Sequence, residues 1–433
     1  MHDLIVRSRR VALPGGVRDS AIVVMDGKIT AIAEYDARLE AAADIDLGEV
    51  ALLPGLVDTH VHVNEPGRTD WEGFATATRA AALGGVTTIC DMPLNSLPPT
   101  VSVDALAAKQ DAAAGQCAVD VAFWGGAVPG NLAEMAPLLD AGVVGFKCFL
   151  SDSGVPEFPP LSAEELRAAM GQLGGTPIIV HAEDPAETSE PYGGKYADFL
   201  GSRPPVSERR AIETVVRAAA ATGARAHIVH LSAAECAALL SGAKAAGIAI
   251  TAETCPHYLF FASEEIPDDR TEFKCCPPIR PGINRQALWR ALTTGVIDYV
   301  VSDHSPCPPA LKAGDFATAW GGISSLQIGL PVVWTAGSRF GASLSDVAGW
   351  MATGPASLAG LPSKGRIAVG CDADLVAFDP SATFTVRGES LAHRHPLTPY
   401  EGRKLTGRVE RVWLGGAEIG DEPRGRLLRR EAP

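Results

Sequence analysis

Two histidines near the start of the chain are the residues whose types and spacing point most directly to chemistry. His60 and His62 stand two positions apart in DTHVH, directly after an apolar run that includes Leu56 and Val57. Such a run predicts a buried strand, and side chains two positions apart on a strand lie on the same face. The spacing therefore predicts that both imidazoles face one space at a strand end, as ligands of a catalytic metal ion do.

Four further residues with metal-binding chemistry lie at or near the ends of predicted strands. His181 closes PIIVH, His230 closes AHIVH and Asp303 follows DYVVS, while Lys147 lies inside the apolar run VVGFKCFL. A buried lysine is unfavourable unless it is paired, neutral or covalently modified. A neutral amine can add carbon dioxide to give a carbamate, whose two oxygens can bridge two metal ions. Histidines, a carbamate and an aspartate together form a plausible ligand set for a binuclear centre.

The other histidines near these strands are weaker candidates for metal ligands. His227 is an odd number of positions from His230, so we expect it to face the other way and to be structural. The same argument turns His304 away from Asp303, and His257 in CPHYL fits either role. Because a single histidine at a strand end is usually structural, the metal hypothesis depends on the convergence of all the candidates on one rim.

The elements that must position these residues are apolar strand candidates alternating with alanine-rich helical stretches. Such alternation predicts a parallel α/β fold, and eight strands are the number that closes a (β/α)8, or TIM, barrel. Active sites of these barrels lie at the C-terminal ends of the strands, which is where the candidate ligands fall. The predicted strands cover residues 53–62, 86–92, 119–125, 143–150, 177–181, 227–231, 248–253 and 297–302.

The two ends of the chain have a different texture from the middle. Short apolar runs separated by turns, such as the Pro14-Gly15-Gly16 turn, fill the first fifty residues, and a similar pattern returns after about Gly365. We therefore expect one small β domain made from residues 1–52 and 364–433, and a barrel from residues 53–363. A chain of 433 residues is long enough for one large core and a smaller one.

Composition excludes some classes of function. The formal net charge of −14 and the lack of a basic stripe argue against nucleic-acid binding. No apolar segment at the N-terminus is long enough for a signal core or a membrane span, so we expect no membrane partner. Nine cysteines without a CxxC spacing, mostly in apolar runs, are typical of buried thiols in a reduced, cytoplasmic protein.

Long segments of the chain resemble the cyclic amidohydrolases of the amidohydrolase superfamily. The resemblance covers almost the whole chain and includes PGLVDTHVHVNEPGRTDWEGF, DMPLNSLPPT, GFKCFLSDSGVPEFP, HAED, HLSAAE, ETCPHYL, CCPPIRP, VSDHSPCPP, AWGGISSLQ and LTPYEGRKLTGRV. It implies a distorted (β/α)8 barrel with a small β-sandwich domain formed from both termini. It also implies a homotetramer, which is the common assembly in this family.

The resemblance also implies how the candidate ligands divide between two divalent metal ions. His60, His62 and Asp303 would hold one ion, and His181 and His230 the other. A carboxylated Lys147 and a hydroxide would bridge the two ions. Asp303 would act as general base and then as general acid. Zinc suits these ligands, and iron, cobalt or manganese suits them as well. Two alternative hypotheses are a mononuclear centre with an unmodified lysine and a non-catalytic relative of these enzymes.

The substrate has to be read from residues around the centre. Dihydroorotases place an arginine where this chain has Asn64, and hydantoinases and dihydropyrimidinases place a tyrosine where it has Asp152. A neutral amide at Asn64 suits a neutral ureido group better than a carboxylate. The resemblance further implies substrate contacts from Asn95 and from the backbone at Cys276. We therefore expect the allantoinase branch, which opens the cyclic amide of allantoin to give allantoate. Dihydroorotase or hydantoinase activity is the alternative.

Overall fold

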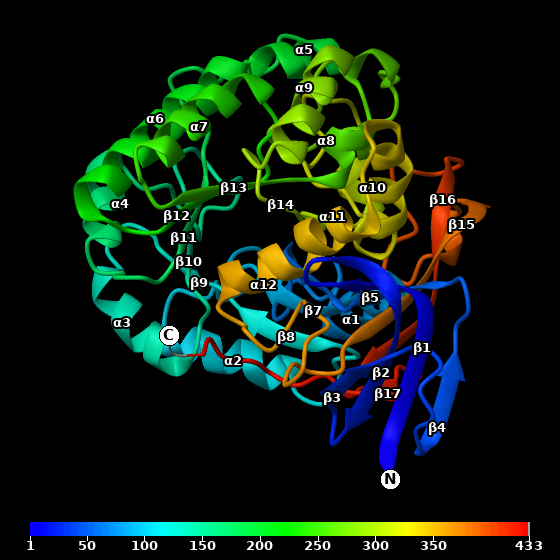
Figure 1. Cartoon of the computed structure of the whole chain (residues 1–433). Helices are drawn as coiled ribbons and strands as arrows, with labels where there is room; N and C mark the ends of the chain where they lie inside the picture. Colours follow the sequence, from blue (N-terminus) through cyan, green and yellow to red (C-terminus); the bar gives the residue numbers. More distant parts are fainter. Residues whose placement is uncertain (432–433) are drawn as a thin grey trace.

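The core of the molecule is a wall of parallel strands. The computed structural model of the protein describes residues 1–431 (Figure 1). Neighbouring strands pair in chain order around the wall, with only Trp124 between β8 and β9, so that these two form one position. The strands are β6 (Leu56–Val61), β7 (Val86–Asp91), β8 (Asp120–Phe123), β9 (Gly125–Gly126), β10 (Phe146–Phe149), β11 (Ile178–His181), β12 (Ala226–Ile228), β13 (Ile250–Thr254) and β14 (Tyr299–Val300).

Contacts between the first and last strands close this wall into a barrel. Val61, the last residue of β6, forms a parallel bridge with His304, and the His62 N–H donates to the His304 carbonyl at 2.8 Å. Most wall residues are fully buried because helices cover them outside and side chains fill the barrel inside. The prediction of a (β/α)8 barrel is confirmed, although β12 and β14 are shorter than the apolar runs suggested.

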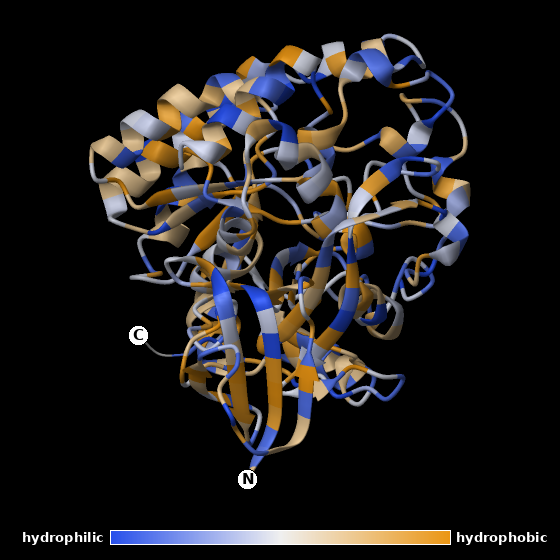
Figure 2. Cartoon of the chain, turned by 45° about the vertical axis from the view of Figure 1, so that its right-hand side comes forward, coloured by the Kyte–Doolittle hydropathy of each residue, from blue (hydrophilic) through white to orange (hydrophobic). Residues whose placement is uncertain are grey.

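Helices surround the barrel, and local sequence signals mark their ends (Figure 1). Ser162 and Glu165 form a capping box at the start of α4, while α6 begins at Pro205 and ends before Gly223 in the left-handed conformation. Figure 2 shows hydrophobic and hydrophilic turns alternating along these helices, as expected for elements with one face on the core. The helices are α1 (Phe74–Leu83), α2 (Val103–Ala113), α3 (Leu132–Ala141), α4 (Ala163–Met170), α5 (Tyr196–Ser202), α6 (Pro205–Thr222), α7 (Ala237–Ala245), α8 (Pro256–Phe260), α9 (Gly282–Thr293), α10 (Gly329–Gly337), α11 (Leu344–Ala348) and α12 (Gly354–Ala359). None of the helices in residues 1–431 combines the length and the hydropathy needed to cross a membrane.

A second, mixed sheet takes strands from both ends of the chain. Its hydrogen-bonded order is β17-β16-β15-β5-β1-β2-β3, with β4 paired to β1. The blue and red ribbons of Figure 1 lie side by side in this sheet. This confirms a β-rich unit built from both termini; the predicted boundary between residues 52 and 53 falls inside β5 and stays a prediction. The strands are β1 (His2–Leu13), β2 (Gly16–Met25), β3 (Lys28–Ala33), β4 (Ala41–Asp46), β5 (Ala51–Pro54), β15 (Leu375–Thr385), β16 (Lys404–Leu414) and β17 (Ala417–Glu418).

A buried ion cluster connects the barrel to the mixed sheet. Lys364 Nζ lies 2.6 Å from Asp120 at the start of β8, and 2.9 and 2.7 Å from Asp372 and Asp374 just before β15. Arg426 of the C-terminal segment also bonds to Asp120, with its backbone N–H at 2.7 Å. Because the lysine and all three carboxylates are buried, their opposite charges must compensate one another at this joint.

Candidate metal centre and active site

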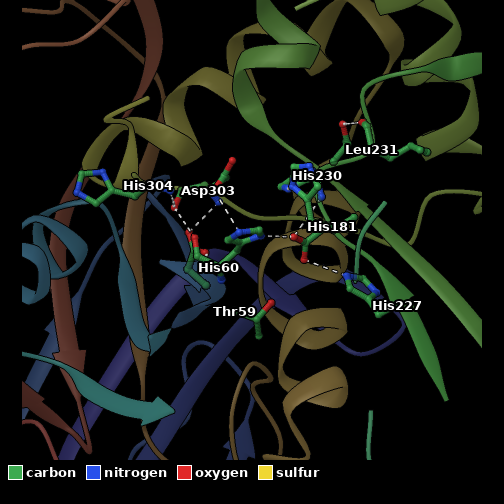
Figure 3. A network of polar contacts seen from close by, with 12 residues as sticks. Thr59, His60, His181, His227, His230, Leu231, Asp303 and His304 are labelled. Atoms are coloured by element: carbon green, nitrogen blue, oxygen red, sulfur yellow. Dashed lines mark hydrogen bonds and ion pairs between the residues drawn. The ribbon is translucent and has the colours of Figure 1, made fainter. Parts of the chain in front are cut away.

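All six predicted metal ligands line one cavity at the carboxyl ends of the barrel strands. The cavity has a volume of about 460 Å³ and opens to solvent on one side. Figure 3 shows the rings of His60, His181 and His230 and the carboxylate of Asp303 turned toward one another. The remaining two candidates, His62 and Lys147, belong to the same lining. Residues separated by more than 240 positions in the sequence therefore meet because barrel closure brings their strand ends together.

The first group of candidate ligands comes from β6 and the loop after β14. Asp303 Oδ1 lies 3.1 Å from His60 Nε2 and 3.6 Å from His62 Nε2. Burial lowers the pKa of both imidazoles well below the usual value, so both rings are neutral. Each neutral ring can present a lone pair to a cation, as a metal-binding histidine must.

The second group comes from β11 and the segment after β12. His181 Nδ1 and His230 Nε2 are 3.0 Å apart, and each ring is buried. One ligand atom each of His60, His230 and Asp303 lies within 4.8 Å of the others. The two groups are thus adjacent, with spacing that suits two cations sharing one cavity.

Lys147 lies between these groups on β10. Its side chain is 1% exposed, and its Nζ has no hydrogen bond or ion pair within residues 1–431. The centroid of the Phe149 ring lies 5.0 Å from Nζ. Burial lowers the pKa of Lys147 to about 8, while burial raises the pKa of the neighbouring Asp303 carboxyl. An unpaired, partly deprotonated amine is what carbamate formation requires.

Two buried glutamates hold the histidine rings on the side away from the cavity, and neither is among the residues predicted from the sequence. Glu253 Oε1 lies 2.5 Å from His60 Nδ1, and Glu183 Oε2 lies 2.9 Å from His181 Nε2. Arg203 pairs with the same oxygen of Glu183 and lines the cavity. The only sequence signal for them is their position, because Glu253 is the last residue of the predicted strand 248–253 and Glu183 follows His181 by two residues.

Several residues of the site have backbone conformations that are rare for side chains with a Cβ atom. The φ angles are +67° at Asn64, +68° at Asn95, +38° at His230 and +46° at Asp303. These values lie in the left-handed region, where glycine is normally favoured and where non-glycine residues concentrate at functional sites. These residues follow the ends of β6, β7, β12 and β14, where the chain turns sharply.

The predicted substrate-binding residues take different positions. Asn95 and Cys276 line the cavity, and Asn95 Nδ2 lies 3.4 Å from His62 Nδ1. Asn64 is 1% exposed, is absent from the lining, and donates through Nδ2 to the Pro306 carbonyl at 3.3 Å. Asp152 also lines the cavity, in the place where a tyrosine would indicate a hydantoinase.

Among the other charged residues near the site, Arg68 is held outside the lining. Its guanidinium donates to Glu157 at 2.6 Å and to the Asn95 carbonyl at 2.9 Å. His227 is absent from the lining as well, and is buried against Glu253 and Thr251. His257 is fully buried near Cys255 and Asp303, with no hydrogen-bond partner for either ring nitrogen in the described part of the chain.

Comparison with known proteins agrees with this geometry. A model of the amidohydrolase family matches residues 51–419. An allantoinase from Streptomyces avermitilis is 53% identical over 440 residues, with 99% of each chain covered, and an allantoinase from Saccharomyces cerevisiae is 47% identical over 382 residues, covering 85% of this chain and 82% of the relative. Among solved structures, an L-hydantoinase (dihydropyrimidinase) from Arthrobacter aurescens superposes with a TM-score of 0.93 at 30% identity, covering 99% of this chain and 100% of the other. The chain therefore belongs to the amidohydrolase family.

Proposed function

We propose that this protein is an allantoinase, which hydrolyses the cyclic amide bond of allantoin to give allantoate. The observation that carries the proposal is the identity of 53% to an allantoinase over 99% of both chains. A cavity lined by all the candidate ligands, with no substitution among them, supports a working hydrolase rather than a non-catalytic relative.

The donor set fits two divalent cations. Buried neutral imidazoles, a buried carboxylate and an unpaired buried amine are costly together unless a cation and a carbamate compensate them. We assign His60, His62 and Asp303 to one ion, His181 and His230 to the other, and the carboxylated Lys147 to both. When bound, the two ions supply an activated water near neutral pH and polarise the ring carbonyl. Zinc is our first choice, and iron, cobalt or manganese suits the same donors.

The protein's own groups would then orient the substrate and move the proton. Asp303 lies at the floor of the cavity beside both His60 and His62, where its carboxylate can take a proton from the attacking water. The same carboxyl can deliver this proton to the ring nitrogen that leaves. The Asn95 amide and the backbone at Cys276 lie on the wall, where they can hydrogen-bond to the ureido and imide groups.

Hydantoinase or dihydropyrimidinase activity is the second candidate function, and dihydroorotase activity is the third. The structural likeness to an L-hydantoinase favours the second, because allantoin and hydantoin contain the same cyclic imide ring. Asp152 in the lining and Arg68 bound to Glu157 count against the alternatives, since neither supplies the tyrosine or the free arginine expected of them.

A single substrate comparison tests the proposal. Purified protein is supplied with zinc, cobalt or manganese and with bicarbonate, and metal content is counted alongside hydrolysis of allantoin, hydantoin, dihydrouracil and dihydroorotate. We expect preferred turnover of allantoin with about two ions per chain. Preference for hydantoin or dihydrouracil would replace the substrate assignment, and one ion per chain would replace the binuclear one.

We further propose that the enzyme is a cytoplasmic homotetramer acting in allantoin degradation. All nine cysteines are unpaired in the structure and eight of them are buried, which suits a reducing compartment. Light scattering on the purified protein tests the assembly, and a monomer at micromolar concentration would contradict it.

A further inference from the structure

The Glu253 carboxylate joins two histidines of very different exposure to the cavity. Its Oε1 lies 2.5 Å from Nδ1 of His60, which lines the cavity, and its Oε2 lies 3.0 Å from Nε2 of His227, which does not. His227 Nδ1 in turn lies 2.8 Å from Thr251 Oγ1. The dashed lines around His60 and His227 in Figure 3 follow part of this chain of contacts.

These linked side chains are shielded from water and packed against their neighbours. His60, Glu253 and His227 are each at most 1% exposed. The His227 ring stacks on Tyr299 with a centroid distance of 5.4 Å and an interplanar angle of 29°. The backbone N–H of His230 also approaches Glu253 Oε1, at 3.4 Å. One carboxylate therefore contacts residues from both candidate ligand groups.

The ionised form of Glu253 gives a consistent arrangement of protons along these contacts. An ionised carboxylate only accepts, so in this form both imidazole nitrogens that face Glu253 carry hydrogen, and the His230 N–H is a third donor to it. This leaves His60 Nε2 with a free lone pair on the cavity side, where Asp303 lies 3.1 Å away. It also leaves His227 Nδ1 as an acceptor, which the Thr251 hydroxyl satisfies. Each contact from His60 through Glu253 and His227 to Thr251 therefore joins one donor to one acceptor.

We propose that Glu253, held by His227 and Thr251, is a positioning unit that fixes the ring orientation and the tautomer of His60 for metal binding. The inference rests on the proposed function, because it takes His60 as a metal ligand. Carboxylates that hold the second nitrogen of a metal-binding histidine orient the ring and increase its basicity. The other group of ligands differs, since His181 is held by a glutamate whose charge Arg203 already balances. Loss of Glu253 should therefore weaken the binding of the ion assigned to His60 more than the binding of the ion assigned to His181.

Zinc binding to three variants tests the unit. Glu253→Gln keeps the shape of the side chain but replaces one acceptor by a donor. Thr251→Val removes the hydroxyl that donates to His227. Asp374→Asn is the matched control, because it removes a buried carboxylate remote from the cavity. Zinc stoichiometry is measured by mass spectrometry and zinc affinity by chelator competition, with circular dichroism and thermal unfolding as the check of folding.

We expect Glu253→Gln to bind one of its two zinc ions about 10- to 100-fold more weakly than the wild type. Thr251→Val should lose about 2- to 10-fold, the equivalent of one neutral hydrogen bond, and Asp374→Asn should match the wild type. If Glu253→Gln does not fold, Thr251→Val decides. Wild-type zinc affinity in whichever of these variants folds would overturn the inference, and so would equal losses in the Asp374→Asn control.

The zinc readout separates this inference from the assignment of the substrate. Folded wild-type protein that binds two zinc ions but does not hydrolyse allantoin would refute the proposed function and leave the comparison of affinities intact. Wild-type protein that binds no zinc, under conditions where the chelator competition is sensitive, would refute the positioning role itself.

Discussion

Truncation of Lys147 gives the sharpest test of the binuclear centre. Lys147→Ala removes the side chain beyond Cβ from a position that is 1% exposed, and leaves a space open to the cavity. Lys147→Met is its matched control, because the thioether fills most of that space while removing the amine. Both variants lose the side chain that we assign to both ions.

The expected loss of activity follows from what that group does. Stabilisation of transition-state charge by a bound metal centre amounts to several kcal/mol, and a loss of about 4 kcal/mol lowers kcat about 1000-fold. The buried position also favours modification of the lysine. Burial lowers the pKa of Lys147 to about 8, so its amine loses its proton more readily than that of an exposed lysine.

Turnover of allantoin in the presence of short carboxylic acids completes the test. Acetate or propionate can place a carboxylate where the carbamate would lie, so we expect partial rescue of Lys147→Ala and none of Lys147→Met. Metal content is counted in both variants to separate lost binding from lost chemistry. Full activity of Lys147→Ala without added acid would refute the binuclear reasoning, and equal rescue of both variants would show that the acids act elsewhere.

Three further predictions concern charge and stability. Asp303→Asn should keep the melting temperature within a few degrees but lower kcat at least 100-fold, because the amide cannot accept the proton; near-normal turnover would exclude Asp303 as the general base. Lys364→Met should lower the free energy of unfolding by about 3–5 kcal/mol, measured by urea denaturation, because the buried Asp374 loses its ion-pair partner and Asp120 and Asp372 each lose one of theirs; an unchanged midpoint would contradict the role of the ion cluster. Burial lowers the pKa of His393 to about 4 from 6.5, so between these values only the unfolded chain binds the proton. Stability should therefore fall by up to about 3 kcal/mol as the pH decreases through that window, and His393→Phe should reduce this dependence in acid-denaturation curves.

The sequence predicted the barrel and the gathering of the six candidate residues because both depend on simple periodicities. His60 and His62 obey the two-residue repeat of a strand, and His181 and Asp303 follow apolar runs that could end only at the rim. Composition alone could not place Asn64, which bonds to the Pro306 carbonyl. Its φ of +67° turns the chain immediately after the histidine pair. Pro66 and Gly67 indicate a turn there, but they do not indicate which partner the Asn64 side chain contacts.

The supporting glutamates could not be predicted for a different reason. Carboxylates are common at strand ends, and which ring Glu253 contacts depends on how far β13 is displaced from β6 across the closed barrel. His60 and Glu253 are separated by 193 positions in the chain, so their contact is a property of the closed fold. The spacing of His227 from His230 predicts a structural role, but it does not reveal that His227 contacts Glu253.

The left-handed backbone at His230 and Asp303 has a consequence for attempts to make the protein more heat-resistant. Each of these conformations costs roughly 1–2 kcal/mol for a residue with a Cβ atom, and glycine would be free of that cost. A selection for thermal survival alone would therefore enrich glycine at the two positions that the proposed centre can least lose. Directed evolution of the metal-free protein for stability therefore has to score turnover in every round, because glycine at either position relieves backbone strain and removes a proposed metal ligand.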